Sequence, residues 1–313
     1  MRMLMAKVLI ADEVHPECAS RLKAAELEVV ERPNISGEAL LASIGEFDAL
    51  VVRSRTKVTA DIIHQARRLK VIGRVGVGLD TIDVKAAENA GIKVINTPQM
   101  STVAVAELVM GMMLNLLRGV HKANESMKKG LWDKKRFHGS ELNGKTLGIV
   151  GFGRIGKAVA ERSKAFGMEI IVYDVVVDDA TLTRTGAKRA QSLEALLASS
   201  DVVTLHVPLL PETVRMINDK SISLMKDGSY LINASRGEVV DTAALLRALK
   251  AGKLAGAALD VYEHEPPTEP HEIELVSLPN VVATPHIGAQ THEAQVTGAI
   301  AIAENIINAF KPL

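Results

Sequence analysis

The sequence has one cysteine and few aromatic residues. With Cys18 as its single cysteine among 313 residues, the chain cannot form an internal disulfide, which is typical of a protein from a reducing compartment. Aromatic residues make up 3% of the chain and apolar residues 47%, so the core has to consist of valine, isoleucine, leucine and alanine. This composition suits parallel strands covered by helices on both faces.

The chain also lacks an excess of either charge and any long apolar run. Acidic and basic residues number 37 each, which argues against binding of nucleic acid or an anionic membrane through net charge. Charges interrupt the apolar runs before they reach the length of a membrane span, and residues 1–7 are too short for a signal peptide. Glu263, His264 and Glu265 have no further ligand at a usual spacing, so no metal site is predicted. We expect a cytoplasmic protein whose partners are small molecules.

A glycine-rich turn lies in the middle of the chain. Gly151, Gly153 and Gly156 follow the apolar run 147–150 and precede Lys157-Ala158-Val159-Ala160, which gives the order strand, tight turn, helix. In a dinucleotide site the first glycine permits the turn, the second lets the pyrophosphate approach the backbone, and the third lets the helix pack closely on the strand. The motif predicts a nucleotide bound at a helix N-terminus.

An acidic residue follows the next strand. Asp174 lies eighteen residues beyond Gly156, directly after the apolar run 169–173. Its carboxylate is placed to accept hydrogen bonds from the adenosine ribose and to repel a 2′-phosphate. Residues 175–177 are all valine, so no cation is available there for that phosphate. The sequence therefore predicts NAD as the cofactor rather than NADP.

The order of elements explains why this motif lies in mid-chain. An alternation of apolar strands and amphipathic segments precedes it, and a second alternation follows it, which predicts two α/β units with parallel sheets. Strands are expected at 7–10, 27–30, 49–52, 71–73, 92–95, 202–206, 230–233, 256–259 and 281–284, and helices at 60–68, 103–118 and 292–310. The final helix has no strand of its own and most simply returns to the first unit. We expect a substrate domain of residues 1–98 and 289–313 and a nucleotide-binding domain of residues 99–288.

Three polar residues lie near the carboxyl ends of later strands, where open α/β sheets bind ligands. Arg236 follows the strand ending at Asn233, and its guanidinium suits a carboxylate and an adjacent carbonyl held by paired hydrogen bonds. His286 follows the last strand, and Glu265 lies in a proline-rich loop. A carboxylate beside an imidazole fixes its tautomer and gives an acid for ketone reduction or a base for alcohol oxidation. The alternatives are a surface salt bridge for the arginine and a packing role for the histidine.

Segments along nearly the whole chain resemble the D-isomer-specific 2-hydroxyacid dehydrogenase family. Besides the glycine motif they are 51–54, 56–59, 73–80, 142–148, 206–209, 233–237, 256–261 and 285–289, in the family's order. The chain is most similar to members that oxidise 3-phospho-D-glycerate to 3-phosphohydroxypyruvate with NAD, the first step of serine biosynthesis. The resemblance implies two doubly wound parallel-sheet domains, with a Rossmann NAD-binding domain inserted into a flavodoxin-like substrate domain.

The resemblance also implies roles for individual residues. Arg236 would bind the substrate carboxylate, His286 would act as acid and base, and Glu265 would be its partner. From the other domain the substrate would contact Arg53, Ser54, Arg74 and Gly76. The expected NAD contacts are Gly151, Gly153, Arg154, Ile155, Gly156, Asp174, His206, Val207, Pro208, Thr213, Ala234, Ser235, Arg236, Asp260, His286, Gly288, Thr102 and Val77.

The identity of the substrate depends on the placement of cations. A phosphorylated acid needs them, and Arg53, Arg55, Lys57, Arg74 and the run 134–136 are candidates, although that run is equally consistent with a solvated face. A glyoxylate or hydroxypyruvate reductase, or another D-2-hydroxyacid dehydrogenase, is the first alternative. An NAD-sensing binding protein related to corepressors is the second, but it would not need a proton relay.

Three further expectations concern the segments outside these motifs. Met100 and Ser101 depart from the residues common in relatives, so the family's contacts at that loop are not carried over. The helix after Pro98 and the basic segment beyond it form the expected surface of a homodimer, or of a tetramer. Because the chain ends at Leu313, directly after the final helix, the serine-binding regulatory module of many relatives is not expected.

Overall fold

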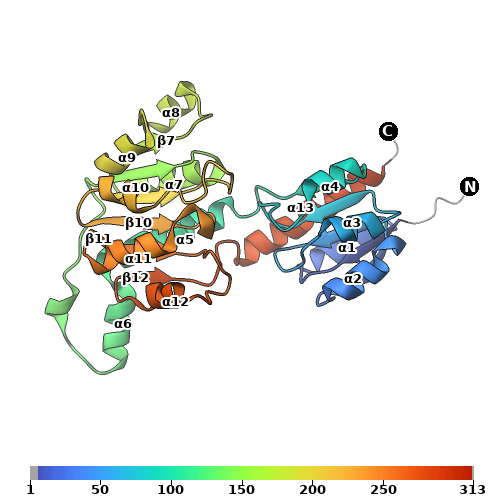
Figure 1. Ribbon diagram of the computed structural model, residues 1–313, viewed down its shortest axis with the longest axis horizontal. Coiled ribbons are helices and arrows are strands. Elements are labelled where there is room, and N and C mark those ends of the chain that lie inside the picture. The colour runs from blue at the N-terminus through green and yellow to red at the C-terminus, as the bar shows by residue number, and fades with distance from the viewer. Residues whose placement is uncertain (1–5, 312–313) are drawn as a thin grey trace, which may run out of the picture. The chain divides into compact units, whose positions relative to one another are not determined.

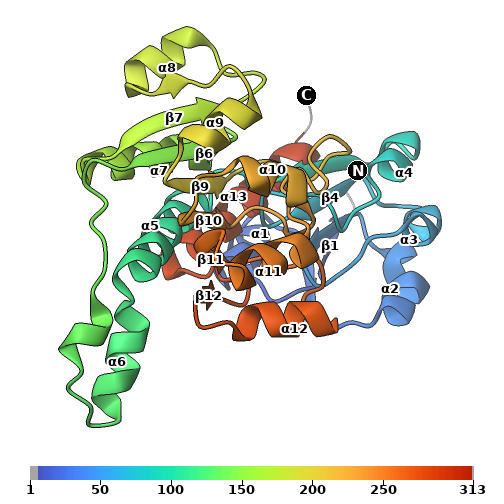
Figure 2. The same ribbon diagram turned by 60° about the vertical axis from the view of Figure 1, so that its left-hand side comes forward.

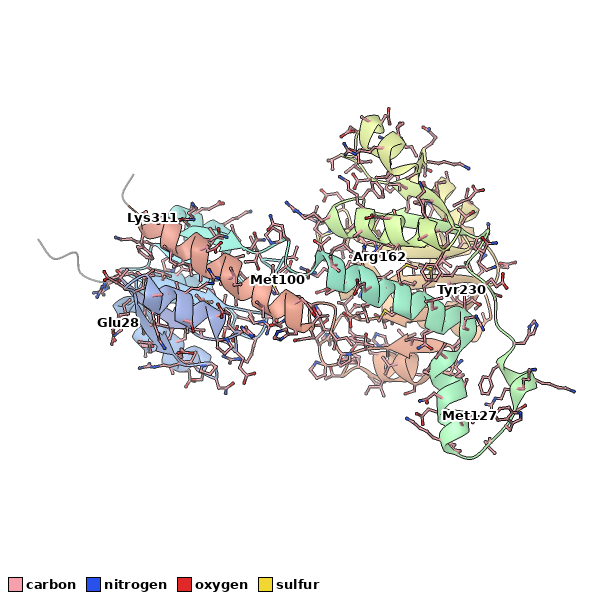
Figure 3. The ribbon with its side chains drawn as sticks, turned by 180° about the vertical axis from the view of Figure 1, so that it is seen from behind. Glu28, Met100, Met127, Arg162, Tyr230 and Lys311 are labelled. Carbon is pink, nitrogen blue, oxygen red and sulfur yellow. The ribbon has the colours of Figure 1, made fainter. Side chains whose placement is uncertain are left out.

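The computed structural model describes residues 6–311 as two α/β units (Figure 1). Unit 1 contains the described residues up to Ser101 and from Ala289 onward, and unit 2 is Thr102–Gly288. The first crossing lies three residues after the expected position at Pro98. The reason is that Met100 is buried, 6% exposed, in the core of unit 1, where it packs with Val75 and beside Gly298 of the last helix (Figure 3).

Unit 1 has a five-stranded parallel sheet in the order β2-β1-β3-β4-β5, which is the flavodoxin-like order. The strands are β1 (Lys7–Ile10), β2 (Glu28–Glu31), β3 (Ala49–Val52), β4 (Val71–Arg74) and β5 (Lys93–Asn96). Helices α2 (Gly37–Ser43), α3 (Ala60–Gln65) and α4 (Val84–Asn89) cover one face, and α1 (Glu17–Ala24) and α13 (His292–Phe310) cover the other. The final helix thus returns to unit 1, as expected. Helix α3 ends before the expected residue 68, because Ala66 has a non-helical ψ of 58°.

Unit 2 has a seven-stranded parallel sheet in the order β12-β11-β10-β9-β6-β7-β8. Counted from the strand of the glycine motif, this is the Rossmann order with one added strand. The strands are β6 (Thr146–Val150), β7 (Glu169–Tyr173), β8 (Lys188–Arg189), β9 (Val202–Leu205), β10 (Ser229–Asn233), β11 (Leu254–Leu259) and β12 (Val281–Ala283). The sequence did not reveal β8, because two residues are too few to produce an apolar pattern. Both units confirm the predicted doubly wound α/β fold.

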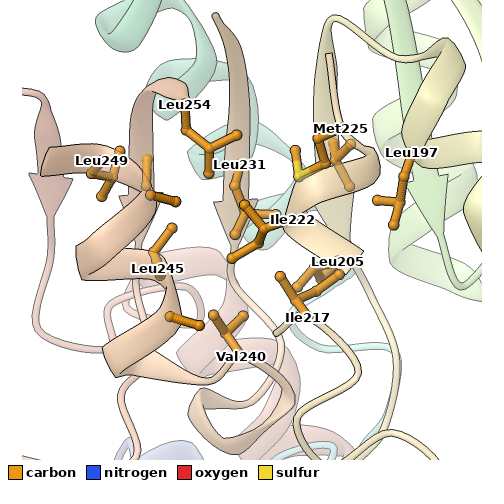
Figure 4. Close-up of a cluster of buried hydrophobic side chains, with 14 of the residues drawn as sticks. Leu197, Leu205, Ile217, Ile222, Met225, Leu231, Val240, Leu245, Leu249 and Leu254 are labelled. Atoms are coloured by element: carbon orange, nitrogen blue, oxygen red, sulfur yellow. The ribbon is translucent and has the colours of Figure 1, made fainter. Parts of the chain in front are cut away.

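The strands of unit 2 are buried on both faces, which explains their continuous apolar runs. Consecutive strand residues point to opposite faces, so in β10 Leu231 joins one core cluster and Ile232 the other. Helices α5 (Thr102–Arg118), α7 (Arg154–Ala165) and α8 (Asp179–Thr185) cover one face; α9 (Leu193–Ser199), α10 (Asp219–Leu224), α11 (Thr242–Lys250) and α12 (Pro270–Ser277) cover the other. Figure 4 shows the cluster that contains Leu231, together with Ile222 and Leu245 from the helices on that face.

An arm extends from the end of α5 away from the sheet of unit 2 (Figures 1 and 2). We define the arm as residues 119–141, which contain α6 (Val120–Lys128) and the short 3-10 helix Lys134–Phe137. Four large apolar side chains of the arm are exposed: Val120, Met127, Leu131 and Trp132. The basic run 134–136 lies in the 3-10 helix and is also exposed. The arm therefore presents apolar and basic side chains outside the core of its own unit.

Residues 6–311 contain neither a candidate single-helix membrane span nor a candidate metal cluster. No single helix there is long and apolar enough to cross a membrane; α5 and α6 pass that test only as a pair bent by 66°, and eight of the 17 residues of α5 are buried. No group of three or more histidine, cysteine, aspartate or glutamate side chains in this range could hold a metal ion.

Candidate functional site

Two glycines of the motif, Gly151 and Gly156, lie where only glycine fits. Gly151 follows β6 with a φ of +90°, and a Cβ there would overlap the carbonyl of His206. A Cβ on Gly156 would overlap the carbonyl of Gly151, so this glycine allows α7 to approach the strand. Gly153 is different, because a Cβ there meets no atom within 4 Å. Gly153 is also the N-cap of α7 and provides no side-chain cap, so Arg154 and Ile155 open a helix whose amides face an accessible space.

This arrangement fits the pyrophosphate of a dinucleotide. The first four amides of a helix have no partner within the helix, and their partial positive charge favours an anion. The open space at Gly153 lets that anion approach the backbone, which agrees with the predicted role of this glycine. The residues present can therefore hold NAD.

Asp174 joins the end of β7 to the glycine turn. Its Oδ2 accepts a hydrogen bond of 2.6 Å from the amide of Phe152, and its Oδ1 accepts bonds of 2.8 Å from the amides of Val176 and Val177. A carboxylate offers about four lone-pair sites, so capacity remains for a ribose hydroxyl. The loop after Asp174 also has a cation that the sequence did not reveal. Arg189 of β8 donates to the carbonyl of Val177 and pairs with Asp179 at 2.8 Å.

His286 and Glu265 form a hydrogen-bonded pair in unit 2. The Nδ1 of His286 lies 2.7 Å from Oε2 of Glu265, although 21 residues separate them. The hydrogen bond to Glu265 raises the pKa of His286 above its ordinary 6.5, against the opposing effect of burial. Burial raises the pKa of Glu265, but the bond to His286 and its charge outweigh this and leave the pKa lowered. The pair can hold a proton on Nδ1 and offer Nε2 to a ligand.

Asp260 shapes the loop that carries His286. This carboxylate, at the end of β11, is 1% exposed and accepts from the Thr284 hydroxyl at 2.6 Å and from the amides of Ile287 and Gly288 at 2.8 Å. Burial raises the pKa of Asp260. His286 itself has a φ of +52°, which is unusual for a residue with a side chain and is often found at functional sites. Asp260 and Gly288, both expected to contact NAD, thus also hold the histidine loop together.

Arg236 lies close to the His286–Glu265 pair, because the backbone after Arg236 packs tightly against the loop that contains Glu265. It follows Asn233 at the end of β10, where the Asn233 side chain donates to the Arg236 carbonyl at 2.8 Å. The next residue, Gly237, has no room for a side chain because a Cβ would overlap the backbone of Tyr262. The positive charge of Arg236 acts on both members of the pair: it opposes the rise that Glu265 causes in the pKa of His286, and it adds to the lowering of the pKa of Glu265. The three residues predicted to carry chemistry are therefore brought together at the carboxyl edge of one sheet.

A cavity of about 460 Å³ lies beside the pair. Apolar groups from the proline-rich loop and β12 line much of it, and Tyr262, Glu265 and His286 contribute polar atoms. The hydroxyl of Tyr262 donates to the carbonyls of Leu259 and Thr284, and burial raises its pKa to about 12, so it stays neutral. Tyr262 was not predicted as a site residue; a tyrosine just after a strand is too weak a signal.

Other expected cofactor residues of unit 2 lie on the same edge, with different surroundings. His206 follows β9, and its Nε2 lies 3.0 Å from the Thr204 hydroxyl. Burial lowers the pKa of His206 to about 3, so the ring is neutral at ordinary pH.

The other expected residues of this edge are held by short hydrogen bonds or buried. The hydroxyl of Thr213 donates to the carbonyl of Pro208 at 2.7 Å and closes the loop after Val207. Ala234 and Ser235 follow β10, and the Ser235 hydroxyl donates to Asn233. The Thr102 hydroxyl, at the start of α5, is buried and has no hydrogen-bond partner among the described residues.

The remaining expected residues lie in unit 1, at the carboxyl ends of β3 and β4. The guanidinium of Arg53 donates to the carbonyl of Glu13 at 3.3 Å, and Ser54 is exposed beside it. Arg74 donates to the carbonyl of Val75 at 3.0 Å and lies against Gly76, whose φ is +149°; Val77 is 40% exposed. Arg55, also expected as a candidate for binding phosphate, has its guanidinium bonded to three main-chain carbonyls and paired with Asp12.

The contrast between the glycines supports a test of the nucleotide site. Gly153→Ala is expected to leave the melting temperature nearly unchanged, because the added methyl meets open space, but to weaken NAD binding by about tenfold or more. Calorimetric titration of the variant with NAD measures this. Gly37→Ala is the matched control, since its methyl also meets no atom within 4 Å but lies in unit 1. Wild-type NAD affinity in Gly153→Ala would contradict the assignment.

The chain is similar to known dehydrogenases in sequence and in structure. Residues 110–288 match the family described as D-isomer specific 2-hydroxyacid dehydrogenase, NAD binding domain. The chain is 46% identical over 303 residues to D-3-phosphoglycerate dehydrogenase of Methanocaldococcus jannaschii, covering 96% of this chain and 57% of that protein. It is also 46% identical to hydroxypyruvate reductase of Thermotoga maritima, over 98% of both chains.

A solved structure has the same fold. The crystal structure of D-lactate dehydrogenase from Aquifex aeolicus, complexed with NAD and lactic acid, is 33% identical with a TM-score of 0.85, covering 96% of this chain and 94% of that one. The chain spans little more than half the length of the curated phosphoglycerate dehydrogenases it matches.

Proposed function

Because this chain belongs to the D-isomer-specific 2-hydroxyacid dehydrogenase family, we propose that it oxidises 3-phospho-D-glycerate to 3-phosphohydroxypyruvate with NAD, the first step of serine biosynthesis. The observation that carries the proposal is the 2.7 Å pair of His286 and Glu265 next to Arg236, on the edge where the glycine motif also lies. A protein that only senses NAD has no need of this proton relay.

The three residues divide the work on the hydroxy acid. Arg236 binds the carboxylate and polarises the adjacent carbonyl or hydroxyl, because its planar fork can make two parallel hydrogen bonds. With Nδ1–H donated to Glu265, the Nε2 of His286 is free to take the proton of the hydroxyl group. The charge of Glu265 stabilises the imidazolium that results. NAD, when bound, supplies the hydride acceptor.

The phosphate of the proposed substrate needs cations outside this group. Arg53 and Arg74 at the strand ends of unit 1 remain candidates, together with Lys57 and the run 134–136 of the arm. Arg55 is the weaker candidate, because its Nη1 and Nη2 atoms already donate to main-chain carbonyls. The similarity to phosphoglycerate dehydrogenases over 96% of this chain supports the choice of a phosphorylated acid.

A hydroxypyruvate reductase is the second candidate. The 46% identity to the Thermotoga maritima enzyme extends over 98% of both chains, so this alternative has similar support from sequence. The same Arg236, Glu265 and His286 would serve, with His286 as the acid that protonates the ketone. The two candidates differ in whether a phosphate is bound.

Steady-state assays with NAD test the proposal. The purified protein is given 3-phosphoglycerate and, in parallel, D-glycerate, D-lactate and 2-hydroxyglutarate, and hydroxypyruvate is tested with NADH. The expected result is that 3-phosphoglycerate has the highest kcat/KM, by about tenfold or more over D-glycerate, because a charge-assisted phosphate contact is lost with the latter. A kcat/KM for hydroxypyruvate with NADH that exceeds the kcat/KM for 3-phosphoglycerate with NAD would instead support the reductase.

We also propose a cytoplasmic homodimer formed through the arm. Met127 is 53% exposed and Trp132 81% exposed, and large apolar side chains gathered on one extension are typical of an interface. A second copy is the proposed partner, since two-fold pairs are the commonest oligomers. The single cysteine, buried in unit 1, suits a reducing compartment.

A further inference from the structure

A buried carboxylate in unit 1 joins two loops that are far apart in sequence. Asp12 lies just after β1 and is 3% exposed. Its Oδ2 accepts from the amides of Arg53 and Thr56, at 2.5 and 3.2 Å, and its Oδ1 accepts from the Thr56 hydroxyl at 2.6 Å. Because β1 and β3 are neighbours in the sheet, these bonds tie the end of one strand to the loop that follows the other.

Arg55 closes the same loop from its other side. Its Nη2 lies 3.0 Å from Oδ1 of Asp12 and donates to the carbonyls of Ala11 and Pro33, at 2.7 and 2.9 Å. Its Nη1 donates to the carbonyl of Ile35 at 3.2 Å. The residues on both sides of Ser54 are thus anchored: Arg53 through its amide, and Arg55 through its side chain.

The side chain of Arg53 has little else to direct it. Its guanidinium contacts the carbonyl of Glu13 at 3.3 Å, which is a long hydrogen bond. The direction in which Arg53 and Ser54 present their polar groups therefore depends on the backbone, and Asp12 determines that backbone through the amides of Arg53 and Thr56.

We propose that Asp12 is a positioning residue for the substrate, which holds Arg53 and Ser54 in the conformation that binds the 2-hydroxy acid. The proposal rests on the proposed function, in which those two residues contact the substrate. Asp12 itself is buried, so its proposed action on the substrate is through the loop. Asp12 lies two residues after β1, and nothing in the sequence indicates which loop it binds.

Asp12→Asn tests the proposal. Asparagine keeps the shape but replaces one acceptor oxygen with an amide that donates, so at least one amide or hydroxyl of the loop loses its partner. The expected result is a rise of about tenfold or more in KM for 3-phosphoglycerate, with kcat and the KM for NAD within about threefold of wild type. Hydrogen–deuterium exchange at the amides of residues 53–56 is expected to become about tenfold faster.

Asp48→Asn is the matched control. Asp48 is 8% exposed, precedes β3 at the opposite end of the strand, and accepts from the Lys7 amide and the Arg68 guanidinium at 2.8 Å. The same chemical change is therefore made in the same unit, at a carboxylate with a similar set of partners. Asp48→Asn is expected to lower the melting temperature but to leave the KM for 3-phosphoglycerate and exchange at residues 53–56 unchanged.

The outcomes separate this proposal from the proposed function. If Asp12→Asn does not fold, Thr56→Val removes only the hydroxyl that donates to Asp12 and accepts from Arg55, and it should raise KM in the same direction by a smaller factor. An unchanged KM in the folded variant, or an equal rise in Asp48→Asn, would overturn the proposal. If the wild type oxidises none of the hydroxy acids, the proposed function fails, and the exchange rates still decide whether Asp12 holds the loop.

Discussion

His286→Asn is expected to lower kcat for oxidation of the hydroxy acid by about 10²- to 10⁴-fold, the range typical of a lost general base. Asparagine is chosen because it tolerates the left-handed backbone that His286 adopts, at a φ of +52°, so the loop held by Asp260 should keep its conformation. The amide has no proton affinity to replace that of Nε2. Stopped-flow measurement of NADH formation gives the rate, and NAD affinity should remain within about threefold of wild type.

The pH profile provides the control for this variant. Oxidation needs the unprotonated imidazole, so wild-type kcat/KM should rise with pH through a pKa above 6.5, because the bond to Glu265 raises that pKa; reduction of the keto acid should fall through the same pKa. His286→Asn should lack this inflection. His264→Asn is the matched variant, since His264 also pairs with a glutamate, Glu272 at 3.2 Å, and it should retain both rate and profile. An unchanged rate in His286→Asn would remove this residue from the mechanism.

Arg236→Lys is expected to lower kcat/KM for 3-phosphoglycerate by about a hundredfold or more. Lysine keeps the charge but has one ammonium group in place of the planar fork, so it cannot hold a carboxylate by two parallel bonds. Arg236 also donates from Nη1 to the Ser235 carbonyl at 2.7 Å, and this bond orients the guanidinium at the end of β10. A lysine cannot keep that bond and bind the substrate in the same geometry. Steady-state kinetics with saturating NAD measure the effect.

Arg215→Lys is the control for the loss of an arginine in the same unit. Arg215 is 59% exposed and pairs with Glu263 at 3.3 Å, and such a surface pair contributes about 0–1 kcal/mol. Its replacement should leave kcat/KM within about threefold of wild type. A fall in Arg236→Lys no larger than that in Arg215→Lys would show that the Arg236 fork does not bind the carboxylate.

Much of the fold could be predicted because it depends on local patterns. A strand buried on both faces needs an unbroken apolar run, so the strands were located within one or two residues; of those in residues 6–311, only β8 was missed. The glycine motif was equally legible, since the overlap of a Cβ on Gly151 or Gly156 with backbone atoms excludes every other residue. The order of elements revealed the insertion of one unit into the other, because the last helix had no strand of its own to cover.

The sequence by itself determined the two parallel sheets, the nucleotide turn, and the strand ends at which Arg236 and His286 lie. Only the tertiary structure decided which side chains are partners. Arg53 and Arg55 belong to one loop. The guanidinium of Arg55 is bonded to the segment after β1 and to the segment 33–35, whereas that of Arg53 makes one long contact. Asp12 likewise acquires its role from a loop more than 40 residues away. Hydrogen bonds between distant segments leave no periodic pattern in the sequence, because their geometry exists only once the sheet has brought the strand ends together.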